Sequence, residues 1–424
     1  MDRIIKMKSF AKIIIAFILI ISSVTSSMAT KVNGKIISDS TGIKIIKVWG
    51  THKERGFATG YLLAENIRDI YMGYILPFLG KYLGAVKDHV RFEKVIKIDK
   101  IFHTEAQSMI AGMKEAGVDI KNLDEYDILL ANAFLDLLGI TSFHELRELS
   151  KKMGCSSLIS WGDATKNTDL IGKAVITRHL DWPNYESVIN NQVIIIHSPS
   201  EPNEQKWMMI GFAGQISVLS GINHSGLGVF LHMLSDYNEP DIPLPEKPFE
   251  PLSFTLRRAL ETKDFNKDGV NNLEDIKEMI NSNAQGYAEG FIVSMVGPTQ
   301  KESKNTAAIF ELAPTPPHIV LRDVTYEDNL NGSNLYTANS AIKRLNKRNY
   351  CKRYLDVSKE VGNGKLMSSE RCWQIMKNYS TLSNNIQFMQ YIPELNILKI
   401  SVYKNGKAAY TYKPHTYDLK ELFK

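Results

Sequence analysis

The spacing of apolar and polar residues divides the chain into a helical part and a strand-rich part. Between residues 51 and 148, apolar residues recur at steps of three and four, a period typical of amphipathic helices. From residue 155 the period changes to two, and turn residues separate the runs, which is typical of strands. Residues 30–48 predict a short strand pair that precedes the helical part.

The strand-rich part predicts five successive strands, two helices and then further strands with one more helix. The expected strands lie at 155–161, 172–181, 191–199, 206–223, 226–234, 290–297, 306–314, 318–324, 396–405 and 407–414, and the expected helices at 253–263, 272–283 and 368–382. Residues 237–253 contain five prolines and predict an irregular loop. This order favours an α+β fold in which helices cover sheets.

The first two of these strands flank a loop rich in turn residues and predict an antiparallel hairpin. The loop is centred near residue 167, so Cys155 is expected opposite about residue 179. Arg178 and Asp181 then arrive beside the sulfur. Strict alternation places these two residues on opposite faces, so the strand is expected to bend before Pro183, which cannot extend a central ladder.

Residues 1–29 have the features of a secretory signal peptide that is removed after Ala29. Four basic residues precede the apolar run IIIAFILII, whose nine residues are too short for a membrane span. Ser27 and Ala29 supply the small residues of a cleavage site. An uncleaved N-terminal anchor is the alternative, and no later apolar run is long enough to span a bilayer.

The chain without this segment carries little net charge. Arg3, Lys6, Lys8, Lys12 and Asp2 contribute a net +3, so their removal lowers the formal charge from +5 to +2. A near-neutral balance gives no reason to expect nucleic acid or an anionic membrane as a partner. We therefore expect a secreted or periplasmic protein that acts on a small molecule.

The three cysteines fall into a neighbouring pair and a single residue. Cys351 and Cys372 lie 21 residues apart and could pair in an oxidising compartment. Cys155 is then the odd cysteine, and an odd cysteine in an exported protein is a candidate free thiol. A lone cysteine is also commonly a small buried apolar residue, so spacing alone leaves both interpretations open.

The segment CSSLISW…VITRHLDWP resembles the nucleophile segment of the cysteine N-terminal-nucleophile hydrolases. The nearest branch is the acyl-coenzyme A:6-aminopenicillanic acid acyltransferase-like family, which is related to acid ceramidase and N-acylethanolamine acid amidase. Other matching segments are GTHKERGFATG, GMKEAG, LLANAFLDL, GFAGQISVLSGINHSGLGV and TAAIFELAP, so the resemblance covers most of residues 30–424. The chain has His179 where the family usually has Asn, and Ser340 where it usually has His.

The resemblance implies a four-layer αββα sandwich and a chain that cuts its own Gly154–Cys155 bond. Residues 30–154 would form the N-terminal chain and 155–424 the catalytic chain, and the two would stay associated. Cys155 would then be an N-terminal nucleophile whose α-amine, with an ordinary pKa of about 7.7–8.0, exchanges a proton with the thiol. Its thiolate would form a thioester with an acyl amide, and water or an amine would release the product.

The same resemblance implies roles for five further residues. Arg178 would hold the thiolate and substrate, and Asp181 would orient the α-ammonium. Asn339 would supply the oxyanion donor, and Asn223 a substrate-carbonyl or orienting contact. Arg371 would lie near the site on a helix. Considered without the family, Arg178 and Asp181 form an ordinary ion pair, Asn223 and Asn339 are turn residues, and Arg371 is a solvated arginine.

Residues 264–275, DFNKDGVNNLED, have the spacing of an EF-hand calcium loop. The expected ligands are the side chains of Asp264, Asn266, Asp268, Asn272 and Asp275 and the backbone carbonyl of Val270, with Gly269 at the sharp turn. Position twelve is Asp rather than Glu, so Asp275 is expected to bind through one oxygen or a water molecule. The expected role of calcium is structural, no organic cofactor is expected, and a polar turn between helices is the alternative.

The leading hypothesis is therefore an exported, self-processing hydrolase or acyltransferase that cleaves acyl amides, including lipid-like ones. One alternative is a phospholipase B-like ester hydrolase of the same fold. A second is a non-catalytic calcium-binding exported protein, which would remain one chain. A third is a thiol hydrolase that uses His179 or His224 as its base.

Overall fold

The structure is a computed structural model that describes residues 31–39, 41–138, 153–234, 247–282, 287–300, 305–326, 330, 332–345, 351–362 and 365–424. The expected signal peptide and most of the expected proline-rich loop lie outside the described residues. The chain forms two units, Met1–Val32 and Asn33–Lys424. Lys31 and Val32, the described residues of the first unit, belong to no helix or strand, so all the described helices and strands belong to the second.

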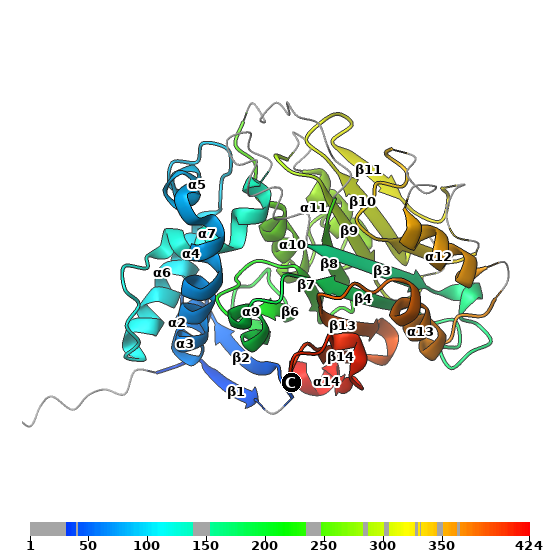
Figure 1. The fold of residues 1–424 in the computed structure, drawn as a ribbon, viewed down its shortest axis with the longest axis horizontal. Helices are drawn as coiled ribbons and strands as arrows, with labels where there is room; N and C mark the ends of the chain where they lie inside the picture. Colours follow the sequence, from blue (N-terminus) through cyan, green and yellow to red (C-terminus); the bar gives the residue numbers. More distant parts are fainter. Residues whose placement is uncertain are drawn as a thin grey trace, which may run out of the picture. The chain divides into compact units, whose positions relative to one another are not determined.

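Two sheets carry the strands of this unit (Figure 1). The larger sheet has nine strands in the order β1(Gly34–Ser38), β2(Lys44–Gly50), β5(Gln192–Pro199), β6(Trp207–Phe212), β7(Ser220–Asn223), β8(Gly228–Met233), β9(Phe291–Val296), β10(Ala307–Leu312) and β11(Ile319–Arg322). The smaller has six, in the order β12(Asn334–Thr337), β3(Gly154–Ser160), β4(Val175–Asp181), β13(Asn385–Ile392), β14(Ile397–Val402) and β15(His415–Asp418). Neighbouring strands run antiparallel except β2 and β5, which are parallel.

Helices follow the expected division of the chain, and the mixture of sheets and helices makes this an α+β protein. Before Cys155 they are α2(His52–Leu62), α3(Ala64–Ile70), the π-helix η1(Tyr71–Ile75), α4(Leu76–Leu79), η2(Gly80–Tyr82), α5(Leu83–Arg91), α6(Lys100–Glu115) and α7(Glu125–Leu137). After it they are η4(Gly162–Ala164), α9(Glu186–Asn190), α10(Leu252–Glu261), α11(Leu273–Asn281), α12(Lys352–Val361), α13(Ser369–Tyr379), η6(Pro393–Leu395), η7(Ala409–Thr411) and α14(Leu419–Phe423).

Several elements differ from the sequence-based expectation. The expected strand at 407–414 is wrong, because the backbone N–H of Tyr410 donates to the side chain of Asn385 and a 3₁₀ turn forms at 409–411. The expected strand at 206–223 is two strands, β6 and β7. The sequence analysis did not predict β12, β13, β15, α9, α12 or α14. Every residue of β13 is buried, so β13 lacks the alternation that marks a half-exposed strand.

The two sheets pack on one another through their apolar faces. Ile159, Ile176 and Met389 of the smaller sheet share one buried cluster with Ile194 and Phe230 of the larger. A second cluster lies on the other face of the smaller sheet, where Leu158 and Phe388 meet Tyr354 of α12 and Trp373 of α13 (Figure 1). On the larger sheet, α2 contacts β1 and β2, and α10 contacts β7 and β8.

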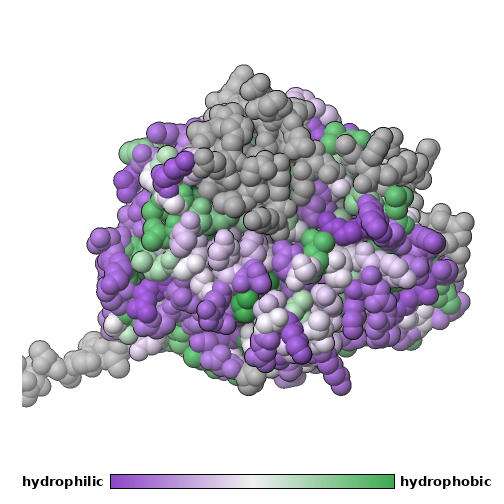
Figure 2. All heavy atoms as spheres, viewed as in Figure 1, coloured by the Kyte–Doolittle hydropathy of each residue, from purple (hydrophilic) through white to green (hydrophobic). Residues whose placement is uncertain are grey.

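The part of the surface that Figure 2 shows in colour is mostly hydrophilic, with hydrophobic residues in small separate groups. Few large apolar side chains are strongly exposed, among them Ile171, Phe92 and Val270. None of the helices in the described ranges combines the length and the apolar character that a membrane span requires.

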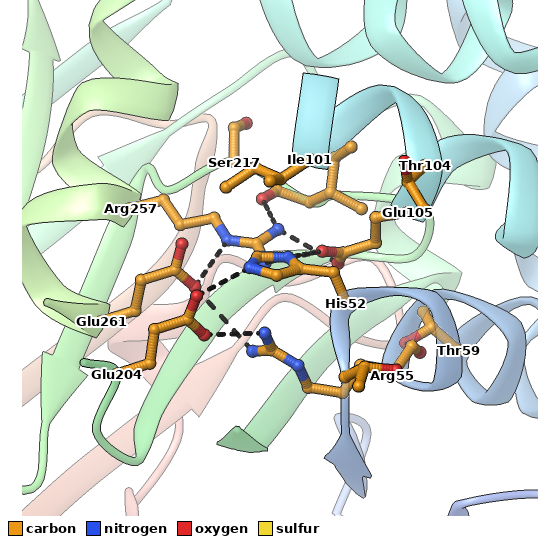
Figure 3. Close-up of polar contacts among 12 residues, drawn as sticks. His52, Arg55, Thr59, Ile101, Thr104, Glu105, Glu204, Ser217, Arg257 and Glu261 are labelled. Carbon is orange, nitrogen blue, oxygen red and sulfur yellow. Dashed lines mark hydrogen bonds and ion pairs between the residues drawn. The ribbon is translucent and has the colours of Figure 1, made fainter. Parts of the chain in front are cut away.

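A network of buried charges, the clasp network, joins the helical part to the rest of the molecule (Figure 3). It consists of His52 and Arg55 of α2, Glu105 of α6, Glu201 and Glu204 after β5, and Arg257 and Glu261 of α10. His52 Nδ1 lies 2.8 Å from Glu105 Oε2, and its Nε2 lies 2.8 Å from Glu204 Oε1. Arg257 Nη2 donates to Glu105 Oε2 at 2.6 Å, and Arg55 Nη2 to Glu204 Oε2 at 2.8 Å.

His52 is held in its charged form by this network. Burial alone would lower the pKa of His52, but its hydrogen bonds to Glu105 and Glu204 outweigh burial and raise that pKa from 6.5 to about 9. Because the folded-state pKa lies above the unfolded one, the stability that His52 contributes is fully present below pH 6.5 and is lost as the pH rises through 9.

We predict that His52→Gln lowers the free energy of unfolding by roughly 3 kcal/mol near pH 6 and by much less above pH 9. Urea unfolding of both proteins at several pH values measures this difference. The difference between the two free energies of unfolding removes the contribution of other groups that titrate in this range. Asp136 is one of them, because burial raises its pKa to about 8. A difference that does not change between pH 6 and pH 10 would contradict the assigned charge of His52.

Candidate active site

The site is built on the hairpin of β3 and β4, whose register decides which side chains meet. Gly154 pairs with Asp181, Cys155 with Leu180, and Ser157 with Arg178. The sequence analysis expected Cys155 opposite about residue 179, and the structure places it one position further, opposite Leu180. A shift of one position matters because successive side chains lie on opposite faces of a strand. Because residues two apart share a face, Arg178 lies on the same side as Cys155, while Asp181 ends the strand beside Gly154.

Cys155 is buried beside the guanidinium of Arg178. Arg178 Nη2 lies 3.8 Å from Sγ and also donates to the carbonyl of Leu231 at 2.7 Å, which fixes the guanidinium. Burial raises the pKa of the Cys155 thiol to about 11, and the positive charge of Arg178 opposes this rise. In the uncut chain the thiol is therefore protonated at neutral pH.

Asp181 lies against Gly154, the residue that precedes Cys155. A Cβ atom added to Gly154 would lie 3.4 Å from Asp181 Oδ2 and 2.6 Å from Cδ1 of Leu382, so a larger residue there would require the Leu382 side chain to move. A register shift in β13 brings Asn385 opposite Asp181, and Asn385 Nδ2 donates to Oδ1 at 2.9 Å. Oδ2 is buried and accepts no hydrogen bond from any described residue. Burial raises the pKa of Asp181 to about 6.

Asn339, which follows β12, holds the nitrogen of the same peptide bond. The backbone N–H of Cys155 donates to Asn339 Oδ1 at 3.0 Å, and Asn339 Nδ2 donates to the carbonyl of Met233 at 2.7 Å. In the uncut chain, Asn339 thus orients the amide of Cys155. Four of the six residues expected at the site, Cys155, Arg178, Asp181 and Asn339, therefore come together around the Gly154–Cys155 bond.

Arg353 is a site residue that the sequence analysis missed. Its Nη2 donates to Asn339 Oδ1 at 2.8 Å, and its Nη1 lies 3.4 Å from the carbonyl oxygen of Cys155. Arg353 lies on α12, a helix that was not predicted. In the sequence, Arg353 is marked only by lying 14 residues after Asn339. That spacing does not show where its helix packs.

Arg371 and Asn223 are not brought to Cys155. Arg371 Nη2 donates to the carbonyl of Glu360 at 2.7 Å, at the far end of α12 from Arg353. Asn223 accepts the backbone N–H of Leu227 at 2.9 Å and so closes the turn between β7 and β8. The contact of Asn223 is that of a turn residue, whereas Arg371 is half-buried and bound to α12, so it is neither a site residue nor a solvated arginine.

The two histidines considered as bases also lie elsewhere. His179 is on the opposite face of β4, where its ring stacks on Phe388 at 4.1 Å and burial lowers its pKa to about 3. The ring of His224 packs 5.8 Å from that of Phe423. A different histidine, His232 of β8, reaches the site face, because its Nε2 lies 3.2 Å from the hydroxyl of Ser157.

The predicted calcium loop forms the turn between α10 and α11. Asp264 accepts the backbone N–H groups of Asp268 at 3.1 Å and Gly269 at 2.8 Å, and Gly269 has the positive φ of +86° that the turn needs. Asp275 is buried and accepts N–H groups from Phe265 at 2.7 Å and from Asn272 at 2.8 Å. Both oxygens of Asp275 are therefore in use, and Asn272 caps α11.

A second set of possible metal ligands lies in the clasp network. Among the described residues, His52, Glu201 and Glu204 bring one ligand atom each within 4.8 Å of one another. Arg55 already donates to a carboxylate oxygen of both glutamates, at 3.3 and 2.8 Å. A buried guanidinium at that place opposes a cation, so these residues fit an ion-pair network better than a metal centre.

Trp182, the residue that follows Asp181 in the chain, lines an apolar cavity of about 60 Å³. Trp182 forms part of its wall and donates its indole N–H to the hydroxyl of Tyr74 at 3.0 Å. Ile67 and Phe134 line it from the helical part, and Phe212 from the larger sheet. The π-helix η1, a rare form that is frequent at functional sites, supplies Tyr74.

Comparison with known proteins gives only distant likenesses. No protein-family profile matches the chain. The chain is 23% identical over 321 residues to Protein dcd1B of Dictyostelium discoideum, a match that covers 71% of this chain and 61% of that protein. The chain thus spans less than two thirds of the length of this relative.

Three solved structures align with part of this chain. The N-acylethanolamine-hydrolyzing acid amidase ortholog of Caenorhabditis elegans is 14% identical, with 57% of this chain and 94% of that chain covered and a TM-score of 0.39. Penicillin V acylase of Agrobacterium tumefaciens is 12% identical, with 63% and 87% covered and a TM-score of 0.40. Conjugated bile acid hydrolase of Clostridium perfringens is 12% identical, with 63% and 93% covered and a TM-score of 0.36. Such low TM-scores do not decide the activity of this chain.

Arg353 and Arg371 provide a matched test of the site. We predict that Arg353→Ala slows cleavage of the Gly154–Cys155 bond by about a hundredfold, because it removes one charged donor next to that bond. Arg371→Ala should leave the rate within about twofold, because Arg371 contacts Glu360 instead. Time-resolved intact-mass analysis measures both rates, and equal effects of the two substitutions would refute the placement of Arg353.

Proposed function

We propose that this chain is an exported, self-processing cysteine amidase or acyltransferase with Cys155 as its nucleophile. The observation that carries the proposal is the arrangement around one peptide bond: Asn339 accepts the N–H of Cys155, Arg178 lies beside its sulfur, and Asp181 faces Gly154. Buried charged groups are costly unless they are paired or serve a function, and here they surround an otherwise ordinary backbone bond. In this proposal the two packed sheets and their covering helices form the αββα sandwich of the N-terminal-nucleophile hydrolases.

Self-cleavage would supply the base that the uncut chain lacks. With a thiol pKa of about 11, Cys155 is a weak nucleophile before cleavage. The new α-amine would lie where the Cys155 N–H now lies, beside Asn339 Oδ1 and near Asp181 Oδ2. An α-amine has an ordinary pKa of about 7.7–8.0, so it can take the thiol proton near neutral pH. Arg178 would then stabilise the thiolate.

The clasp network would keep the two chains together after the cut. His52, Arg55 and Glu105 precede Cys155, whereas Glu204 and Arg257 follow it. The pairs His52–Glu204, Arg55–Glu204 and Arg257–Glu105 would therefore join the two products. Removing one member of a buried pair leaves an uncompensated charge, which is strongly destabilising. The chains are therefore expected to remain one complex.

The apolar cavity beside Trp182 is proposed as the start of the acyl site. Trp182, which follows Asp181 in the chain, lines it together with side chains from both chains, which suits the apolar part of an acyl amide or lipid-like substrate. Its volume of about 60 Å³ is small for a ligand pocket, so a long acyl chain would require η1 and α7 to move. The proposed reaction agrees with the hydrolase and acylase names of the three solved structures, but its support is the geometry of the site.

We predict that the purified protein consists of two fragments that meet at 154/155, and that Cys155→Ala stays one chain. Cys372→Ala is the matched control, because it also removes a buried thiol and should cleave normally. Intact-mass analysis shows whether each protein is cut. Release of amine from a series of acyl amides, beside the corresponding esters, measures which bond the protein cleaves. An active wild-type protein without a fragment that begins at Cys155 would refute the proposal.

We also propose that the 264–275 loop binds calcium in a structural role. The support is the residue spacing together with the turn at Gly269, where the Asp264 carboxylate accepts the N–H groups of Asp268 and Gly269. Calcium binding would require Asp275 to give up a backbone hydrogen bond or to bind through water, which favours weak affinity. Extracellular modules of this kind have dissociation constants of about 10⁻⁴ to 10⁻³ M.

For this loop we predict that 10 mM calcium, but not magnesium, stabilises the protein by roughly 1.4 kcal/mol for a dissociation constant of about 1 mM. The combined substitution Asp264→Asn and Asp268→Asn should abolish the effect, whereas Asp119→Asn, at an exposed acid elsewhere, should not. Urea unfolding with each ion measures this. The proposal fails if calcium stabilises the double variant as much as the wild type.

A further inference from the structure

Glu311 of β10 is a fully buried carboxylate that holds a segment of backbone close to the site. Its Oε1 accepts the N–H of Ile342 at 3.0 Å and of Lys343 at 3.1 Å, and its Oε2 accepts those of Lys343 at 3.1 Å and Arg344 at 2.8 Å. Three consecutive N–H groups on one carboxylate leave residues 342–344 little freedom to move. Charge-assisted hydrogen bonds of this kind are stronger than neutral ones.

Arg322 of β11 extends this hold to the other side of Asn339. Its Nε donates to Glu311 Oε1 at 3.2 Å, and its Nη2 donates to the carbonyl of Tyr336 at 3.0 Å. Both side chains of the pair are fully buried. The pair thus grips the chain three residues before Asn339 and again three to five residues after it.

Asn339 itself lies outside the regular strand pairing. The ladder between β12 and β3 ends at Thr337, opposite Ser157, so no sheet hydrogen bonds hold the residues that follow. Met233 and Arg353 hold the side chain of Asn339, and the place of its backbone depends on what anchors the segment on its two sides. A buried ion pair is weak evidence for stability, but it can serve to fix one arrangement.

We propose that Glu311 and Arg322 are positioning residues that hold Asn339 against the Gly154–Cys155 bond and thereby set the rate of self-cleavage. This inference rests on the proposed function. Neither residue touches the reacting atoms. Both act through the 336–344 segment, which presents Asn339 Oδ1 to the N–H of Cys155.

The step that depends on this placement is an exchange of bonds. The Cys155 sulfur bonds to the carbonyl carbon of Gly154, and the carbon–nitrogen bond to Cys155 breaks. The thiol proton ends on the departing nitrogen, which becomes the α-amine, and water then hydrolyses the thioester to a Gly154 carboxylate and a free thiol. Asn339 Oδ1 keeps the nitrogen in place throughout, and a misplacement of about 1 Å in such a step can cost a hundredfold in rate.

The test uses Glu311→Gln, which keeps the shape of the side chain and removes its charge. We expect cleavage at 154/155 to slow by about tenfold or more, measured by intact mass at intervals after synthesis in a cell-free system. Because this variant leaves Arg322 buried without its partner, the combined change Glu311→Gln and Arg322→Met is made as well. It removes both charges and should also cleave slowly.

Glu105→Gln is the matched control, because Glu105 is likewise a fully buried carboxylate bound by a buried arginine, Arg257. It should lower the unfolding midpoint as Glu311→Gln does, yet cleave at the wild-type rate. A double-mutant cycle with Asn339→Ala separates positioning from general destabilisation. If Glu311 acts through Asn339, the double variant should cleave less than about threefold more slowly than Asn339→Ala alone.

The outcomes distinguish this inference from the function on which it rests. A wild-type chain that never cleaves refutes the proposed function, and this inference with it. A wild-type chain that cleaves while Glu311→Gln cleaves equally fast refutes the inference alone. The inference is also refuted if Glu105→Gln slows cleavage as much as Glu311→Gln does. It is refuted as well if the double variant is slowed by the full product of the factors for Glu311→Gln and Asn339→Ala.

Discussion

The pairing of β3 with β4 is the constraint on which the site depends. With Gly154 opposite Asp181, the carboxylate lies beside Gly154, and Arg178 shares a face with the sulfur. A slip by one residue would turn Arg178 toward α13 and away from Cys155, because side chains alternate between the faces of a strand. The apolar faces on both sides of the sheet oppose such a slip.

Buried charges around this hairpin connect segments that are distant in sequence. The clasp network joins the helical part to residues that follow Cys155, and Glu311 with Arg322 grips the backbone on both sides of Asn339. Ionised groups lose much hydration free energy when they are buried, and the loss is offset only where partners are well placed. Each network therefore restricts the molecule to one arrangement of its segments, and the candidate site lies between them.

The parts of the site that could be predicted are those that local patterns encode. Alternation and turn residues predict the hairpin, so Cys155, Arg178 and Asp181 could be placed together to within one residue. The placement of Asn339, by contrast, came from a resemblance, and the same resemblance chose Arg371, whereas Arg353 is the arginine that contacts Asn339. The choice between two arginines on neighbouring helices depends on how α12 and α13 pack, and the sequence carries no local signal for that.

By itself, the sequence determined the α+β character, most of the strands, and the hairpin that brings Arg178 and Asp181 to Cys155. These follow from hydrophobic period and turn chemistry, which act over a few residues. Only the tertiary structure decided that β13 lies between β4 and β14, that Arg353 rather than Arg371 reaches the site, and that Glu311 holds the segment of Asn339. Those results depend on burial and on contacts between residues tens to hundreds of positions apart, which no local pattern records.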